Sequence, residues 1–307
     1  MGTPGFAVPS LEALVAAGHD VVAVVTQPDR PRGRGLASSS PPAAQVARRL
    51  AIPVLQPARV RDPAFLPRLV PLAPDIIAVA AFGQILPRAL LDLPRLGCVN
   101  VHASLLPKYR GAAPIQRAIL EGERVTGITT MFMNERMDEG DILLAREVPI
   151  EPGETAGHLE ERLARVGAAL LVETIEGLVT GRITPRPQDH GHATLAPRLT
   201  KEDGRIRWEE SAQAIVNRVR AATPRPGAFT RVGGKVLKVW EAREADAQAP
   251  AEPGTVLRAD DAGILVAAGD ACAVLLAEVQ AEGKRRLPAG EFVRGARMAA
   301  GARLEDA

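Results

Sequence analysis

Short apolar runs and amphipathic segments alternate through the first third of the chain. Ser10 is a favourable N-cap for the segment LEALVAA, and Gly18 follows that segment where a left-handed residue commonly ends a helix. The run VVAVV (21–25) is apolar at every position, which predicts a strand buried on both faces. The pattern continues with helices expected at AAQVARRLA and AFLPRLVPLA and strands expected at IPVL, DIIAVA and GCVNV. Strands that alternate with helices predict an α/β fold with a doubly wound, mostly parallel sheet.

The pattern changes near residue 188. The stretch PRPQDHGHATLAPRLTKEDGRIR has little apolar periodicity, which predicts a linker that lies over the surface. A helix is expected over 211–221, followed by the short strands AFTRV, KVLKVWEA, GTVLRA, GILVAA and AVLLAEVQ. Gly, Asp and Pro separate these strands at intervals typical of a small β-barrel. We therefore expect an α/β domain over 1–187, a linker over 188–207 and a barrel domain over 208–307.

Composition restricts the class of protein. The formal net charge of +2 is too small for a globally basic protein, so a surface for nucleic acid would have to be a local patch. Cys98 and Cys272 form no Cys-x-x-Cys pair and suit a reducing compartment. The N-terminus carries no basic-then-apolar signal, and no apolar run reaches the roughly 18 residues of a membrane span. A cytoplasmic protein without a membrane segment is the expectation.

Asn100 and His102 stand at the end of one predicted strand. Side chains alternate along a strand, so both should project from the same side, at the edge where parallel sheets bind ligands. An amide can hold a developing oxyanion, and an imidazole can transfer protons near neutral pH. A carboxylate-rich loop follows at MDEGDILL (137–144), and Asp141 would orient the imidazole if it reaches it. These residues suit acyl transfer to an amine without a metal ion, and the pair His190 and His192 lacks the partners of a metal site.

Several motifs carry a resemblance to a known family. Asn100-Val-His102, the stretch SLLPKYRGAAPIQRAI and Gly140-Asp141 resemble the formyltransferase superfamily that uses 10-formyltetrahydrofolate. The stretches TQPDRPRGRG (26–35) and LAPRLTKEDGRIRW (195–208) are similar to one branch of it, the methionyl-tRNA formyltransferases. The resemblance covers nearly the whole chain. It implies a formyltransferase-type Rossmann-like domain, a C-terminal domain similar to an oligonucleotide-binding (OB) barrel, and a monomer.

The resemblance also implies a reaction. The α-amino group of methionine on the charged initiator tRNA would attack the formyl carbon of 10-formyltetrahydrofolate, the product serving translation initiation. Asn100 and protonated His102 would stabilise the tetrahedral oxyanion, while Asp141 would support the histidine and help carry the proton to N10 of the folate. No metal ion takes part. The residues implied in folate binding are Ser104, Leu105, Leu106 and Pro107.

Two basic regions are candidates for contact with tRNA. The loop 28–49 is rich in arginine, and the resemblance places its important arginine on Arg34, with Arg32 beside it. The lysines that usually follow are replaced by LASSS (36–40), which would reduce affinity or change its salt dependence. The second region, residues 215–243, has few aromatic residues, which favours phosphate contact over base stacking. The other candidate residues are Lys201, Arg218, Lys235 and Lys238.

One departure from the family lies at the start of the chain. The family has a β-strand before its Gly-Thr-Pro sequence, whereas this chain opens at Met1-Gly-Thr-Pro4. We expect a start assigned too late, since a chain complete as numbered would expose the edges of neighbouring strands and be poorly stable.

Three other functions fit parts of the same pattern. A 10-formyltetrahydrofolate hydrolase or a sugar-amine formyltransferase would use the same catalytic residues, with water or another amine as the acceptor. A non-catalytic relative that binds tRNA or folate is the third. The loop at 26–35 and the C-terminal region favour tRNA, and intact Asn100, His102 and Asp141 favour an enzyme.

Overall fold

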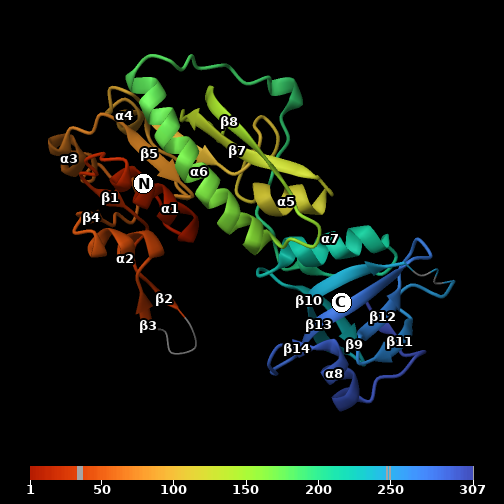
Figure 1. Cartoon of the computed structure of the whole chain (residues 1–307). Helices are drawn as coiled ribbons and strands as arrows, with labels where there is room; N and C mark the ends of the chain where they lie inside the picture. The colour runs from red at the N-terminus through yellow and green to blue at the C-terminus, as the bar shows by residue number, and fades with distance from the viewer. Residues whose placement is uncertain (33–36, 247, 249, 307) are drawn as a thin grey trace. The chain divides into compact units, whose positions relative to one another are not determined.

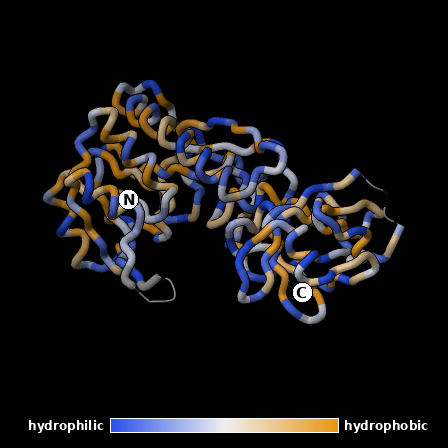
Figure 2. Tube along the Cα trace, turned by 60° about the horizontal axis from the view of Figure 1, so that its bottom comes forward, coloured by the Kyte–Doolittle hydropathy of each residue, from blue (hydrophilic) through white to orange (hydrophobic). Residues whose placement is uncertain are grey.

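The computed structural model describes residues 1–32, 37–246, 248 and 250–306 (Figure 1). The chain forms two compact units, and hydrophobic segments occur throughout both (Figure 2). Unit 1 consists of Met1–Pro114, Val125–Pro149 and Glu160–Pro197, and unit 2 of Ile115–Arg124, Ile150–Leu159 and Arg198–Ala307.

Unit 1 contains the expected α/β pattern. Its strands are β1 (Val24–Val25), β2 (Arg30–Arg32), β3 (Ala37–Ser39), β4 (Val54–Leu55), β5 (Ile77–Ala80), β6 (Cys98–His102), β7 (Val125–Phe132) and β8 (Ile142–Pro149). β1 pairs in parallel with β4, and β5 pairs in parallel with β6. β7 and β8 extend the second sheet in the antiparallel sense, giving the order β5-β6-β7-β8, while β2 and β3 form a separate hairpin. The sheet therefore brings β6 into its centre.

Three helices of unit 1 lie at predicted positions with shifted ends, namely α1 (Val8–Ala16), α2 (Pro42–Arg49) and α3 (Leu66–Leu69). Helix α4 (Arg88–Leu91) and the long α6 (Ala156–Val179) were not predicted, and most of α5 (Pro114–Leu120) belongs to unit 2. Ser10 does not cap α1, because that helix begins two residues earlier with a proline in its first turn. Gly18 follows its end with a φ of +81°, as expected. The segment AFLPRLVPLA forms only the short α3 and a 3₁₀ turn, since its prolines lack an amide hydrogen.

Helix α6 crosses the sheet of unit 1 (Figure 1). It approaches closely at Gly167, where a Cβ atom would lie 2.7 Å from Cγ1 of Val101 in β6 and 3.5 Å from Cδ1 of Ile128 in β7. Glycine therefore lets the helix lie directly on the strand that carries Asn100 and His102.

A cavity of about 460 Å³ separates β1 from β5. Met1 and Gly2 lie between the ends of these strands, where the Gly2 amide donates to the Val25 carbonyl at 3.0 Å and the Ala80 amide donates to the Met1 carbonyl at 2.9 Å. Residues 21–25 and 76–80 line the cavity, together with apolar residues of α1 and α6. The β1–β4 pair is thus a sheet separate from β5–β8.

Unit 2 is a curled antiparallel sheet with a packed interior. Its elements are α7 (Ala212–Ala222), β9 (Ala228–Val232), β10 (Lys235–Ala245), β11 (Val256–Asp260), β12 (Gly263–Ala267), β13 (Ala273–Ala281), β14 (Leu287–Pro288), α8 (Ala289–Ala296) and β15 (Leu304–Glu305). The strand order is β11-β12-β13-β10-β9-β15, with β14 beside β13. The prediction of a helix followed by a small barrel-like domain is confirmed, and Ser211 caps α7 by accepting a hydrogen bond from the Ala214 amide.

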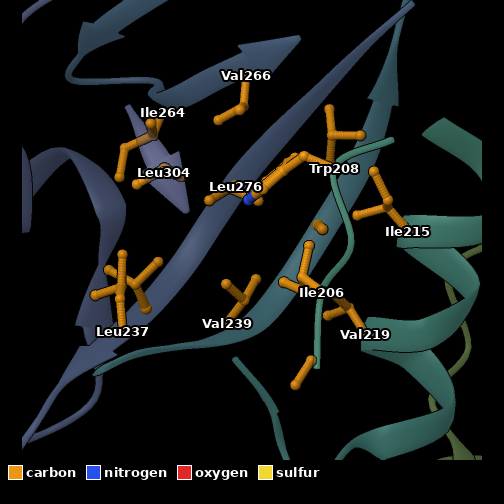
Figure 3. Packing of buried hydrophobic residues seen from close by; sticks show 14 of the residues in the cluster. Ile206, Trp208, Ile215, Val219, Leu237, Val239, Ile264, Val266, Leu276 and Leu304 are labelled. Carbon is orange, nitrogen blue, oxygen red and sulfur yellow. The ribbon is translucent and has the colours of Figure 1, made fainter. Parts of the chain in front are cut away.

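The core of unit 2 surrounds Trp208. Figure 3 shows Ile206, Ile215, Leu237 and Leu276 packed with it between the helix and the strands. The Trp208 side chain is 1% exposed, and its indole N–H donates to a threonine hydroxyl at 3.1 Å. A large apolar ring with its one polar group satisfied anchors this domain.

Candidate active site

Strand β6 places Asn100 and His102 beside a single carboxylate. Nδ2 of Asn100 lies 3.4 Å from Oδ1 of Asp138, and Nδ1 of His102 lies 3.7 Å from Oδ2 of the same residue. The Gly111 amide also donates to Oδ2, at 2.8 Å. Two side chains from alternate positions of one strand thus converge on Asp138, as the strand alternation predicts.

The two ring nitrogens of His102 have different roles. Nε2 lies 2.9 Å from the backbone carbonyl of Tyr109, and a carbonyl only accepts hydrogen bonds, so Nε2 carries a hydrogen. Nδ1 is therefore the nitrogen that can gain or lose a proton. It faces Asp138, and the His102 side chain is only 6% exposed.

The carboxylate at the imidazole is Asp138, whereas the sequence interpretation assigned this position to Asp141. In the described part of the chain, no hydrogen bond or ion pair joins the Asp141 side chain to His102. The Asp141 carbonyl accepts from the Phe132 amide at 2.9 Å, so this residue already belongs to the pairing of β7 with β8. Asp138 lies in the preceding turn with a φ of +56°, a conformation that aspartate tolerates better than most residues.

Gly140 fixes that turn. A side chain at this position would collide with the carbonyl of Phe132, so only glycine lets the loop close against β7. The Asp-x-Gly spacing of residues 138–140 is the signal in the sequence that could have identified Asp138.

The segment 104–107 forms a packed turn directly after β6. The Ser104 hydroxyl is buried and donates to the Lys108 carbonyl at 2.6 Å, and Thr129 of β7 holds the backbone of Ser104 and Leu106. Leu105 lies against Gly127 of β7. The turn therefore lies beside the end of β6 that carries His102, and the Ser104 hydroxyl holds its shape.

The loop after this turn is bound to the segment that leads out of unit 1. Tyr109 donates its amide to Oγ1 of Thr194 at 2.8 Å, and the Arg110 amide donates to the Thr194 carbonyl at 2.8 Å. The Ala196 amide donates to the Arg110 carbonyl at 2.7 Å, and a Cβ on Gly111 would lie 2.8 Å from the Ala196 carbonyl oxygen. The segment predicted as a surface linker thus pairs, in part, with the loop that follows β6.

Comparison with known proteins decides the family. The sequence model described as Formyl transferase matches residues 1–175, and the model described as Formyl transferase, C-terminal domain, matches residues 198–297. A methionyl-tRNA formyltransferase of Acidobacterium capsulatum is 51% identical over 99% of this chain and 97% of its own length. One of Pelotomaculum thermopropionicum is 50% identical over 100% of this chain and 98% of its own length. The chain belongs to the methionyl-tRNA formyltransferase family.

Solved structures share the fold of this formyltransferase. The sugar 3N-formyltransferase WlaRD, crystallised with dTDP and 5-N-formyl-THF, matches 92% of this chain and 97% of its own with a TM-score of 0.66 at 18% identity. HypX from Aquifex aeolicus with tetrahydrofolic acid matches 88% of this chain and 46% of its own, with a TM-score of 0.61 at 20% identity. At these identities the likeness concerns the fold alone.

Two further features are absent from the described residues of this formyltransferase. They contain no group of three or more His, Cys, Asp or Glu side chains arranged to hold a metal ion. No helix among them is long and apolar enough to cross a bilayer.

In the basic loop of this formyltransferase, β2 pairs with β3, and side-chain hydrogen bonds hold the residues next to these strands. Asp29 accepts from Ser40 at 2.8 Å and from Gln56 at 2.7 Å, and Arg48 donates to Ser40. The hydrogen bonds from Gln56 and Ser40 lower the pKa of Asp29. Arg32 ends β2, and Arg34 lies outside the described residues.

Unit 2 of the formyltransferase separates the four predicted cations into two groups. Lys201 lies over the ring of Phe229 and Lys238 over the ring of Trp240, both with the ammonium 5.5 Å from the ring centroid, and Lys235 is exposed. Arg218 is different. Its guanidinium donates to both carboxylate oxygens of Glu210 at 2.6 Å and its side chain is 13% exposed, so it is a structural ion pair and not a free surface cation.

Proposed function

We propose that this formyltransferase moves the formyl group of 10-formyltetrahydrofolate to the α-amino group of methionine on initiator tRNA, for translation initiation. The observation that carries this proposal is the convergence of Asn100 and His102 on Asp138 in a chain whose relatives of this name match it from end to end. An amide, an imidazole and a carboxylate at one strand end are the groups that acyl transfer to an amine requires.

The chain's own residues supply the chemistry as follows. The amine nitrogen attacks the formyl carbon, giving a tetrahedral intermediate whose oxygen carries the negative charge. Asn100 has a second amide hydrogen beyond the one directed at Asp138, and protonated His102 has its Nδ1 hydrogen, so both can donate to that oxygen. The bond from carbon to N10 then breaks, and the proton released by the amine goes to N10.

In this proposal Asp138 takes the role that the sequence interpretation gave to Asp141. Its Oδ2 lies 3.7 Å from Nδ1 of His102. At this distance the carboxylate stabilises the positive charge of protonated His102 without taking its Nδ1 hydrogen, and it can accept the proton released by the amine before N10 receives it. The Gly111 amide donates to the same oxygen and holds the carboxylate in place.

The folate would border the turn that follows β6. Leu105 and Pro107 are partly exposed and supply apolar surface there, while Leu106 is buried and the Ser104 hydroxyl is engaged in holding the turn. Ser104 therefore contributes to folate binding through the shape of the turn. The family and its folate-containing structural neighbours support a folate-derived formyl donor.

The tRNA would meet cations in both units. In unit 2 the aromatic rings under Lys201 and Lys238 restrict where these ammonium groups lie, which prepares them for phosphate oxygens. Lys238 and Phe229 are paired across β10 and β9, so Lys201 and Lys238 belong to one face of that sheet. In unit 1 the candidates remain Arg32 and Arg34.

The test is a direct assay of acceptor and product. The purified protein is incubated with 10-formyltetrahydrofolate and methionyl initiator tRNA, and formyl-methionine and free formate are followed together. Formyl-methionine that disappears in the His102→Ala variant supports the proposal. Formate without formyl-methionine would identify a hydrolase, and formylation of an amino sugar in place of the tRNA would identify the other alternative.

A further inference from the structure

A buried pair of side chains joins the two catalytic loops. Arg110 follows the Tyr109 carbonyl that holds His102, and Gln188 comes from the segment predicted as a linker; both are 5% exposed. The guanidinium of Arg110 donates from Nε at 3.1 Å and from a terminal nitrogen at 2.7 Å to Oε1 of Gln188. The other end of the Gln188 amide donates at 2.8 Å to the carbonyls of Asp138 and Gly140.

Both N–H groups and the oxygen of the Gln188 amide are hydrogen-bonded in this arrangement. Its two N–H groups face two carbonyl oxygens, and its oxygen faces a cation. A reversed amide would set oxygen against the carbonyls and N–H groups against the guanidinium. The orientation of the Gln188 amide is therefore determined. A buried amide whose donors and acceptor are all hydrogen-bonded is held in one conformation.

The contacts on Asp138 bear directly on the catalytic carboxylate. Asp138 has a left-handed backbone conformation, and Gln188 grips the carbonyls on either side of residue 139. The direction of the Asp138 side chain depends on that backbone, and its carboxylate meets both Asn100 and His102. Arg110 is fixed in turn by an ion pair with Glu139, at 3.5 Å.

We infer that Gln188 is a positioning residue of the reaction, which sets the Asp138 carboxylate against His102 by clamping the Asp138 turn to Arg110. This inference rests on the proposed function only in requiring that Asp138 and His102 act together. Gln188 is buried, and its amide is engaged by Arg110 and by the Asp138 and Gly140 carbonyls, so it acts through the protein and not on a substrate. Its effect on the rate passes entirely through the carboxylate that it aims.

The experiment is a double-mutant cycle between Gln188 and Asp138. Gln188→Ala should lower kcat on the order of 10-fold to 100-fold, the loss expected when a catalytic group is misplaced by about an ångström. KM for each substrate should change by less than about twofold, because none of the groups that Gln188 contacts is a candidate for substrate binding. In the Asp138→Asn background the same change should have almost no further effect, since there is no carboxylate left to aim.

Two further variants separate aiming from folding. Gln188→Glu keeps the size of the side chain and an acceptor for Arg110, but it replaces the N–H groups directed at the Asp138 and Gly140 carbonyls, so kcat should fall while Arg110 remains paired. Gln188→Met keeps the volume without any polar contact and is used if the alanine variant does not fold. His192→Ala, at an exposed histidine of the same segment, is the matched control and should behave as the unmodified protein.

The outcomes are distinct. An equal loss from Gln188→Ala with and without Asp138 would overturn the inference, since that is the result of a merely structural role. So would a loss confined to KM. If the unmodified protein releases formate and forms no formyl-methionine, the proposed function fails, and the same cycle measured on formate release still decides the role of Gln188.

Discussion

Nδ1 of His102 faces Oδ2 of Asp138 at 3.7 Å, while Nε2 is held by the Tyr109 carbonyl. The imidazole thus has one nitrogen fixed by the backbone and one directed at a carboxylate. This relationship distinguishes Asp138 from Asp141, the acid that the sequence interpretation favoured, and leads to the first prediction.

Asp138→Asn should lower kcat by about 10² to 10⁴, the contribution of a positioned proton-transfer group. Asp141→Asn, three residues along the same loop, is the matched control and should retain most of the activity, because no interaction of its side chain with His102 is present among the described residues. Steady-state kinetics of formyl-methionine formation compares the two variants. A larger loss in Asp141→Asn would return the catalytic role to that residue.

Lys238→Ala should weaken the interaction with tRNA without changing the chemical step. Loss of one phosphate contact reduces the slope of log affinity against log salt by about 1 and raises KM for tRNA while kcat stays constant. Binding of initiator tRNA measured over a series of salt concentrations gives that slope. Arg258→Ala, which removes an arginine of β11 paired with Asp260, is the control and should leave the slope unchanged.

Much of the fold could be predicted because hydrophobic periodicity is a local property. The strand that carries Asn100 and His102, helix α7 with its Ser211 cap and the five main strands of unit 2 all follow from it. Side-chain alternation then places Asn100 and His102 together without knowledge of tertiary structure.

The rest of the site depends on backbone geometry that residue types do not specify. Asp138 and Asp141 are both acids in one loop, and the choice between them depends on a left-handed turn and on the tight packing of Gly140. Gln188 lies in a polar segment, so its burial could not be seen. Arg218 carries the same charge as its exposed neighbours, and only its bidentate pair with Glu210 shows that it belongs to the fold.

The two cysteine thiols should react at very different rates. Cys98 is buried in β6, and burial raises the pKa of its thiol to about 12, so almost no thiolate is present near neutral pH. Cys272 is exposed. A disulfide reagent at pH 8 should titrate one thiol per chain rapidly in the folded protein and two in denaturant. Rapid reaction of both thiols in the folded state would show that β6 is not packed as described.

The last prediction concerns the close approach of α6 to β6, the strand that carries Asn100 and His102. Alanine is ordinarily favoured over glycine within a helix by roughly 0.5 to 1 kcal/mol, but a Cβ at Gly167 would lie 2.7 Å from Cγ1 of Val101. Val101, the residue between Asn100 and His102 in the sequence, is buried and has a stiff, branched side chain. Removing the collision therefore requires the helix or the strand to move. Overpacking of this kind costs about 1 to 3 kcal/mol, so Gly167→Ala should lower both the free energy of unfolding and kcat.

A control variant and a compensating variant test the Gly167→Ala prediction. Gly295→Ala, in α8, places a Cβ with nothing within 4 Å and should leave stability unchanged or slightly raised. Val101→Ala removes the atom that collides, so the double variant Gly167→Ala, Val101→Ala should be more stable than the sum of the two single changes indicates. Chemical denaturation measures this coupling, and kcat should recover in parallel if the helix aligns the strand that carries Asn100 and His102. Additive losses of unfolding free energy would mean that the two substitutions act independently. Asn100 and His102 would then not depend on the close packing of α6 against β6.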